Sequence, residues 1–194
     1  MLYKKMADIL SPIEVGEAKV VIMDYTNKKL GFWETMSGIR NEKYAKLIVN
    51  GELVMSETPM EHRTNSDFVL DANGDVLIGG LGLGMIILAV QDKENVSSIT
   101  VVERSQDVID TVANQLPLNN KVKIICNNVF TYKPSNKFDC IYMDIWSYVN
   151  EDIYKEMQTL KRRYGHYLKP KKESPKRFNR CWAEWYAKTG SKLI

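Results

Sequence analysis

The chain has 194 residues, of which 44% are hydrophobic and 26% are charged, and its formal net charge is +3. This composition suits one globular domain with a substantial core and argues against disorder except at the ends. No run of about 18 apolar residues occurs, and no hydrophobic signal segment opens the sequence. We therefore expect a cytoplasmic protein that makes no membrane contact.

Metal and disulfide chemistry find little support in the sequence. The cysteines Cys126, Cys140 and Cys181 are odd in number and lack C-x-x-C spacing, and only His62 and His166 could assist them. We expect reduced thiols and no structural metal.

The N-terminal third predicts a small helix and a β-hairpin. Apolar residues recur at helical spacing in residues 2–10, and residues 17–26 have the β-branched content of a strand. Asn50 and Gly51 stand between two alternating apolar runs, which is the strongest short-range hairpin signal. Residues 1–68 are therefore predicted to form a helix and hairpin extension.

Residues 75–90, the centre of the chain, read DVLIGGLGLGMIILAV. Such an apolar run, followed by glycines and a second apolar run, predicts a buried parallel strand, a glycine turn and a buried helix. Glycines let a ligand approach the backbone, and a helix N-terminus attracts anions. The stretch predicts a nucleotide-like ligand at the turn.

The glycine spacing bears on which nucleotide is bound. The dinucleotide pattern G-x-G-x-x-G is broken by Met85, which weakens an NAD interpretation. Gly80, Gly82 and Gly84 give G-x-G-x-G instead, and Glu103, at the end of the next strand, lies 19 residues after Gly84. That distance is close to the roughly 20 residues expected for a carboxylate that binds ribose hydroxyls. The alternative is that the glycines only permit tight strand–helix packing.

Two more strands and two helices follow. Ser105 is placed to cap a helix, residues 121–127 read as a strand, and a helix is predicted after Asn150. A strand is also predicted over residues 138–144. Its carboxyl end should open onto the ligand crevice of an open α/β sheet, which makes Asp144 and the next two residues candidates for the pocket wall.

These segments appear in the order DVLIGGLGLG, ITVVERSQDVIDTV, KVKIICNNVF and KFDCIYMDIW. The series resembles the motifs of class I S-adenosylmethionine-dependent methyltransferases, and it is most similar to their spermidine-synthase-like branch. The resemblance covers about residues 45–146. It implies an α/β fold, with a Rossmann-like parallel sheet and flanking helices in residues 69–168, and S-adenosylmethionine as the cofactor.

The resemblance also implies which residues hold the cofactor. They are Gly80, Leu81, Gly82, Gly84, Glu103, Arg104, Asn128, Val129, Asp144 and Trp146. Asn128 stands where the family has an acid that accepts from the adenine amino group, and its amide oxygen can still accept. Asp144 is also the candidate catalytic residue, facing the methionine end or the acceptor; the alternative is that it only caps the following segment.

A polar segment, residues 56–68, precedes the first core strand. In the spermidine-synthase-like family such a segment faces the substrate, so the resemblance makes Glu57, Glu61 and Asn65 candidates for that role. The alternative is a solvated loop with helix-initiating residues.

Two departures from the spermidine synthase pattern oppose aminopropyl transfer. Ser147 replaces the aspartate that deprotonates the attacking amine there, and Leu83 replaces an acid in the glycine loop. A methyltransferase needs few catalytic side chains, because the sulfonium is reactive and positioning supplies much of the rate. The favoured function is methyl transfer to an unidentified acceptor. The alternatives are an aminopropyltransferase and a non-catalytic module that binds a nucleotide or a partner.

Residues 169–194 show neither the alternation nor the length for the three further strands of a full methyltransferase sheet. We therefore predict about four parallel strands, extended by the N-terminal hairpin, with the C-terminal strands missing. The alternative is that another protomer covers the sheet edge, which makes a homo-oligomer a candidate assembly.

The C-terminal region is basic, with 12 Lys and Arg against 5 Asp and Glu in residues 151–194. In the tail, residues 169–194, basic residues alternate with aromatic ones, a mixture that suits nucleic acid as a partner. The alternative is that Trp182, Trp185 and Tyr186 pack over the sheet edge while the lysines face solvent.

Overall fold

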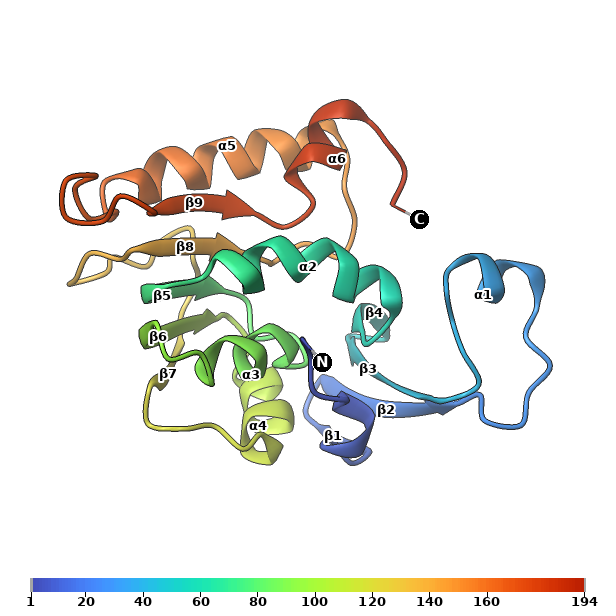
Figure 1. Cartoon of the computed structure of the whole chain (residues 1–194). Helices are drawn as coiled ribbons and strands as arrows, with labels where there is room; N and C mark the ends of the chain where they lie inside the picture. Colours follow the sequence, from blue (N-terminus) through green and yellow to red (C-terminus); the bar gives the residue numbers. More distant parts are fainter. Residues whose placement is uncertain (1, 194) are drawn as a thin grey trace.

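The structure is a computed structural model that describes residues 2–193, apart from the side chain of Trp33. It contains two β-sheets (Figure 1). One is antiparallel and has the order β1 (Ile13–Val15), β2 (Ala18–Asp24), β3 (Lys43–Val49) and β4 (Glu52–Ser56). The other is parallel and has the order β7 (Val122–Cys126), β6 (Val96–Glu103), β5 (Gly74–Gly79), β8 (Cys140–Met143) and β9 (Phe178–Cys181). The α-helices are α1 (Phe32–Met36), α2 (Pro59–Asp71), α3 (Met85–Gln91), α4 (Gln106–Val112), α5 (Glu151–Gly165) and α6 (Glu184–Thr189), and the 3₁₀ turns are η1 (Met6–Asp8) and η2 (Ala113–Gln115).

Helices cover both faces of the parallel sheet, so its central strand is apolar on both sides. In β5, Val76 and Ile78 join a core cluster that also contains residues of α2, α3 and α4. Leu77, which points the other way, belongs to a second cluster with Met157 and Leu160 of α5. This arrangement confirms the predicted α/β fold with a Rossmann-like parallel sheet, and Figure 1 shows α5 apart from α2, α3 and α4.

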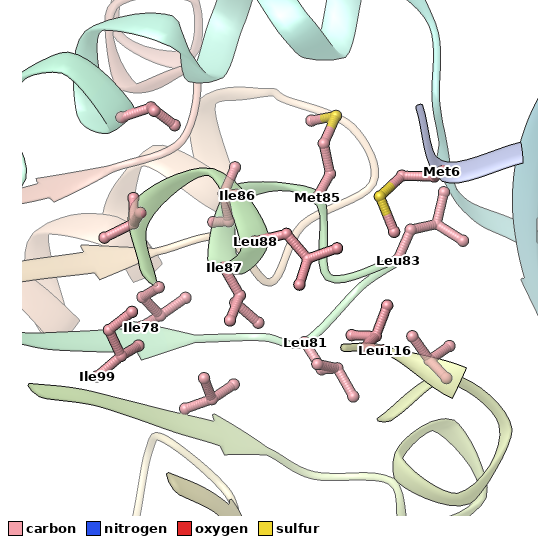
Figure 2. Packing of buried hydrophobic residues seen from close by; sticks show 14 of the residues in the cluster. Met6, Ile78, Leu81, Leu83, Met85, Ile86, Ile87, Leu88, Ile99 and Leu116 are labelled. Atoms are coloured by element: carbon pink, nitrogen blue, oxygen red, sulfur yellow. The ribbon is translucent and has the colours of Figure 1, made fainter. Parts of the chain in front are cut away.

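The helix after the glycine turn is buried almost completely. Met85, Ile86, Ile87 and Leu88 are each at most 3% exposed. They pack above the parallel strands around Ile78, as Figure 2 shows. A helix without a polar face must be enclosed in this way, which is why the sequence allowed its burial to be predicted.

The predicted hairpin is confirmed, but its place in the fold was not foreseen. Val49 pairs with Glu52, and Asn50 and Gly51 both have positive φ angles, of 52° and 79°, as a type I′ turn requires. The hairpin does not extend the parallel sheet. It forms the β3–β4 half of the separate antiparallel sheet, beside the carboxyl ends of the parallel strands (Figure 1).

The expectation of about four parallel strands is corrected to five. Strand β9 pairs with β8 in parallel, and no further strand of this sheet follows it within residues 2–193. The sequence hid β9 because it lies at the edge, where polar side chains are tolerated: Asn179 donates to the Lys161 carbonyl at 2.9 Å, and Arg180 pairs with Asp71 at 2.7 Å.

Two helical segments also differ from expectation. Only the single turn η1 forms within residues 2–10, where the Glu57 carboxylate accepts from the backbone N–H groups of Met6 and Ala7. In contrast, the polar segment leads into the long helix α2, so a solvated loop is the wrong description. Its periodicity is weak because Glu61 and Asn65 lie on its buried side.

Replacing Trp182 tests whether the C-terminal region is part of the core. Trp182 is 2% exposed, and its indole N–H donates to the Thr64 hydroxyl at 3.0 Å. We expect Trp182→Ala to lower the free energy of unfolding by about 3–5 kcal/mol, the usual cost of emptying a buried tryptophan site. Urea unfolding followed by circular dichroism measures this. The matched control is Trp185→Ala, since Trp185 is 62% exposed and should change stability by less than about 0.5 kcal/mol. Equal effects of the two substitutions would contradict the structure.

Candidate functional site

A cavity of about 160 Å³ lies at the carboxyl ends of β5, β6 and β8. Chain order along the parallel sheet runs outward from β5 in both directions, through β6 to β7 and through β8 to β9. In open α/β sheets, ligands bind at such a switch point, outside the carboxyl ends of the strands. Gly80, Glu103 and Asp144, which follow or end these three strands, all line the cavity.

The glycine loop is closely covered on two sides. Gly80 has a φ of 95°, and a Cβ there would lie 2.2 Å from the carbonyl oxygen of Asp144. Gly82 has a φ of 52°, and a Cβ there would lie 2.3 Å from Sδ of Met55 on β4. The same sulfur accepts from the Leu83 backbone N–H at 3.3 Å. The loop therefore has both the backbone geometry and the surroundings that only glycine fits.

Glu103 joins the glycine loop to the end of β6. Its Oε2 accepts from the Leu81 backbone N–H and its Oε1 from the Ser105 backbone N–H, each at 2.9 Å. The side chain is 9% exposed and lines the cavity. A carboxylate has about four acceptor positions, so two remain for a ligand.

Other cavity residues are also held by their neighbours. Asn128 Oδ1 accepts from the Phe130 backbone N–H at 2.8 Å, which leaves the amide oxygen one further lone pair. The Trp146 indole N–H donates to Glu156 of α5 at 3.0 Å. These two hydrogen bonds fix the positions of Asn128 and Trp146 in the cavity wall.

Most residues predicted from the resemblance lie around this one cavity. Those that line it are Gly80, Gly82, Glu103, Arg104, Asn128, Val129, Asp144 and Trp146. Leu81 and Gly84 are not among the lining residues. The Leu81 side chain is in the core, at 2% exposure, and Gly84 precedes α3 with its α-carbon facing Leu116.

The hairpin contributes residues that sequence reasoning missed. Leu47 and Val49 of β3 and Val54 and Met55 of β4 line the cavity. A signal was present, because Leu53, Val54 and Met55 put apolar side chains on both faces of β4, which is typical of a strand with a second packing partner. The sequence did not say what that partner was.

Only one of the polar candidates on and before α2 reaches the cavity. Glu57 is fully buried and accepts from the backbone N–H of Ala45 at 3.3 Å in addition to those of η1, so it anchors the fold. Asn65 is fully buried as well, and its Oδ1 accepts from the Tyr142 hydroxyl at 2.9 Å. Glu61 is 8% exposed and lines the cavity.

Glu61 and Asp144 form a pair of carboxyl groups in a desolvated setting. Burial raises the pKa of Glu61, and the negative charge of Asp144 raises it further. Burial likewise raises the pKa of Asp144, which lies beside the glycine loop, with its backbone N–H donating to the Gly79 carbonyl at 2.8 Å. Desolvation disfavours the charged form of an acid, so both groups hold a proton more tightly than in water.

The basic residues of the tail lie away from the cavity. Lys171, Lys172 and Lys176 are exposed and precede β9, so they lie near the amino ends of the parallel strands. Lys169 pairs with Asp75 and Asp139, each at 2.7 Å. These positions give no support to nucleic acid as the acceptor at the cavity.

The tail aromatics are divided between core and surface. Trp182 belongs to the core cluster and Tyr186 packs against it, whereas Trp185 is exposed. Trp182 therefore packs into the core, as the packing alternative predicted, and is not part of a base-stacking surface.

The described residues contain neither a metal-binding cluster nor a membrane-spanning helix. Within residues 2–193, no group of three His, Cys, Asp or Glu side chains could hold a metal ion. In that same part of the chain, every helix is too short or too polar to cross a bilayer.

Comparison with known proteins gives partial structural likenesses only. No protein-family description matches the chain, and no curated protein matches it. One similar structure is the N-methyltransferase NodS from Bradyrhizobium japonicum WM9, which has also been solved with S-adenosyl-L-homocysteine. It is 15% identical to this chain with a TM-score of 0.46, and the match covers 59% of this chain and 65% of the NodS chain. An S-adenosylmethionine-dependent methyltransferase from Clostridium acetobutylicum ATCC 824 is 19% identical with a TM-score of 0.43, over 56% of this chain and 46% of its own. The plantazolicin methyltransferase BpumL is 17% identical with a TM-score of 0.42, over 58% of this chain and 45% of the BpumL chain.

The chain thus spans less than two thirds of each of these proteins. All three are methyltransferases, and none of them supports the similarity to spermidine synthases.

The pH dependence of stability tests the acid pair. A carboxyl group with a raised pKa in the folded state binds its proton more tightly there than in the unfolded chain. The free energy of unfolding should therefore fall as the pH rises above about 4, the ordinary carboxyl range, and through neutrality. Glu61→Gln should weaken this fall and stabilise the protein at alkaline pH. Urea unfolding between about pH 5 and about pH 9 measures the slope.

The control for that measurement is Asp67→Asn. Asp67 lies on α2 like Glu61, but it is exposed and does not line the cavity. This variant should keep the slope of the unchanged protein. A Glu61→Gln slope equal to that of the control would show that Glu61 titrates as a solvated acid.

Proposed function

We propose that this protein binds S-adenosylmethionine in the cavity and transfers its methyl group to an acceptor. The observation that carries the proposal is the Glu103 carboxylate. It lies against the glycine loop at the switch point of the sheet and keeps acceptor capacity toward the cavity. A carboxylate in this position is suited to accept hydrogen bonds from ribose hydroxyls.

The chemistry of the cavity wall fits the cofactor. Glu103 would hold the ribose, and the Asn128 amide oxygen would accept from the adenine amino group. Val108 and Phe130, which also line the cavity, offer an apolar surface for the base. Asp144, on the β8 side of the loop, would face the methionine end or the acceptor.

Positioning and exclusion of water are what this chain contributes to the reaction. When bound, S-adenosylmethionine supplies an electrophilic methyl group on a sulfonium. Because the sulfonium is already reactive, alignment of the acceptor supplies much of the rate. The β3–β4 hairpin covers the glycine loop through Met55, and Trp146, fixed by Glu156, closes another part of the wall.

Aminopropyl transfer has no supporting observation of its own. Leu83 is fully buried in the core and, as Figure 2 shows, lies beside Met6. Its position in the loop therefore faces the protein interior. Ser147 is exposed and is not among the residues that line the cavity.

Substitution of Glu103 tests the proposal. We expect Glu103→Ala to weaken S-adenosylmethionine binding about tenfold or more, because charge-assisted hydrogen bonds to the ribose are lost. Isothermal titration calorimetry measures the affinity, and circular dichroism checks the fold, since Glu103 also holds the loop. The control is Glu94→Ala, an exposed acid two residues before β6, at the opposite end of the strand from the cavity. Unchanged affinity in folded Glu103→Ala would refute this role.

The same calorimeter separates the alternatives. S-adenosylmethionine, S-adenosylhomocysteine and decarboxylated S-adenosylmethionine are titrated into one sample. Tightest binding of the decarboxylated compound would favour aminopropyl transfer. No binding of any of the three would favour a non-catalytic module.

A further inference from the structure

The β8 side of the cavity holds two carboxyl groups that the protein itself leaves without partners. Glu61 enters from α2 and Asp144 from the end of β8, and both line the cavity. Glu61 is only 8% exposed. Within residues 2–193, neither side chain makes a hydrogen bond or an ion pair with another residue. Glu61 is buried and Asp144 is half-buried, and a desolvated acid without a partner is costly, which points to a ligand that supplies the missing donors.

Neighbouring polar groups are already engaged elsewhere. The Tyr142 hydroxyl donates to Asn65 at 2.9 Å, and the Asn65 amide N–H donates to the backbone carbonyl of Glu61 at 3.2 Å. The Tyr3 hydroxyl donates to the backbone carbonyl of His62 at 3.0 Å. These contacts fix the walls around the two acids while leaving both carboxyl groups open toward the cavity.

The cavity has no cation of its own on this side. Arg104 is the one lysine or arginine among the described residues that line it, and it follows β6. Strand β5 lies between β6 and β8 in the sheet, so Arg104 and Asp144 belong to opposite sides of the glycine loop. A cationic ligand would meet two acids without competition from a protein cation.

We propose that Glu61 and Asp144 bind the acceptor substrate, and that this acceptor is a primary or secondary amine that enters as an ammonium ion and is methylated at nitrogen. The inference rests on the proposed methyl transfer. Ammonium N–H groups would satisfy both carboxylates, and Leu47 and Trp146 offer apolar lining for the body of the amine.

The same pair serves the proton transfer that N-methylation needs. An ammonium nitrogen has no lone pair, so one N–H proton first passes to a carboxylate of the pair. The freed lone pair then forms the new C–N bond with the methyl carbon, while the C–S bond breaks and its electrons remain on sulfur as a thioether. The methylated nitrogen is again a cation. Raised carboxyl pKa values make this proton transfer easier than it would be to a solvated acid.

Benzylamine, benzyl alcohol and benzoate are matched probes for this site, because they differ only in the polar group. Each is titrated at about pH 8.5 into the protein, with and without saturating S-adenosylhomocysteine, by calorimetry. The other titratable groups near Asp144 are Tyr3, Tyr142 and Cys181, whose pKa values are all raised by burial, so they stay uncharged at that pH. We expect benzylamine to bind and the other two probes not to bind.

Conservative variants identify the groups responsible. Glu61→Gln and Asp144→Asn should each weaken benzylamine binding about tenfold or more, while Asp67→Asn should leave it unchanged. Carbon-13 NMR of the carboxyl groups gives a second readout, since bound benzylamine should lower the pKa of Glu61. Equal benzylamine binding in Glu61→Gln and Asp67→Asn, or binding of benzyl alcohol as tight as that of benzylamine, would overturn the inference. Failure of S-adenosylhomocysteine to bind would instead overturn the proposed function. The benzylamine titration without S-adenosylhomocysteine tests the acid pair by itself, so the two failures can be told apart.

Discussion

The placement of β5 between two parallel neighbours is the constraint on which the rest of the structure depends. A strand with partners on both edges and helices on both faces must be apolar where both faces are covered, as Val76, Leu77 and Ile78 are. The chain must then leave this strand abruptly and start a helix that is itself buried. Only a glycine-rich turn does so in the available space, and Glu103 fixes that turn by accepting from its backbone. The cavity is a consequence of this geometry.

Stability and function pull in opposite directions at the two unpartnered acids. Glu61 occupies the buried side of a helix, where an apolar residue would pack without desolvation cost. Asp144 is half-buried, and its desolvation raises its pKa as well. Proteins tolerate such positions where a site needs groups whose protonation state can change near neutral pH. Glu57 shows the contrasting solution, because its buried carboxylate is satisfied by backbone N–H groups on η1 and β3.

Local signals in the sequence were sufficient for the elements, and less so for their assembly. The Asn50-Gly51 turn and the Ser105 cap depend on a few adjacent residues, and both formed as predicted. Glu103 lies against the glycine loop, because one helix and one strand bring the chain back beside it. The hairpin's position over the loop depends on contacts distant in sequence, which periodicity does not encode. Strand β9 was missed because edge strands need no apolar pattern.

The pairing of β8 with β9 has a consequence for biosynthesis. Strand β8 is buried along its whole length, yet one of its edges is satisfied only by residues 178–181, almost forty positions further along the chain. While the ribosome has yet to deliver that segment, β8 presents an open apolar edge of the kind that recruits strands from other chains. Until β9 has been synthesised, the newly made protein therefore has an unpaired strand edge that the folded protein lacks.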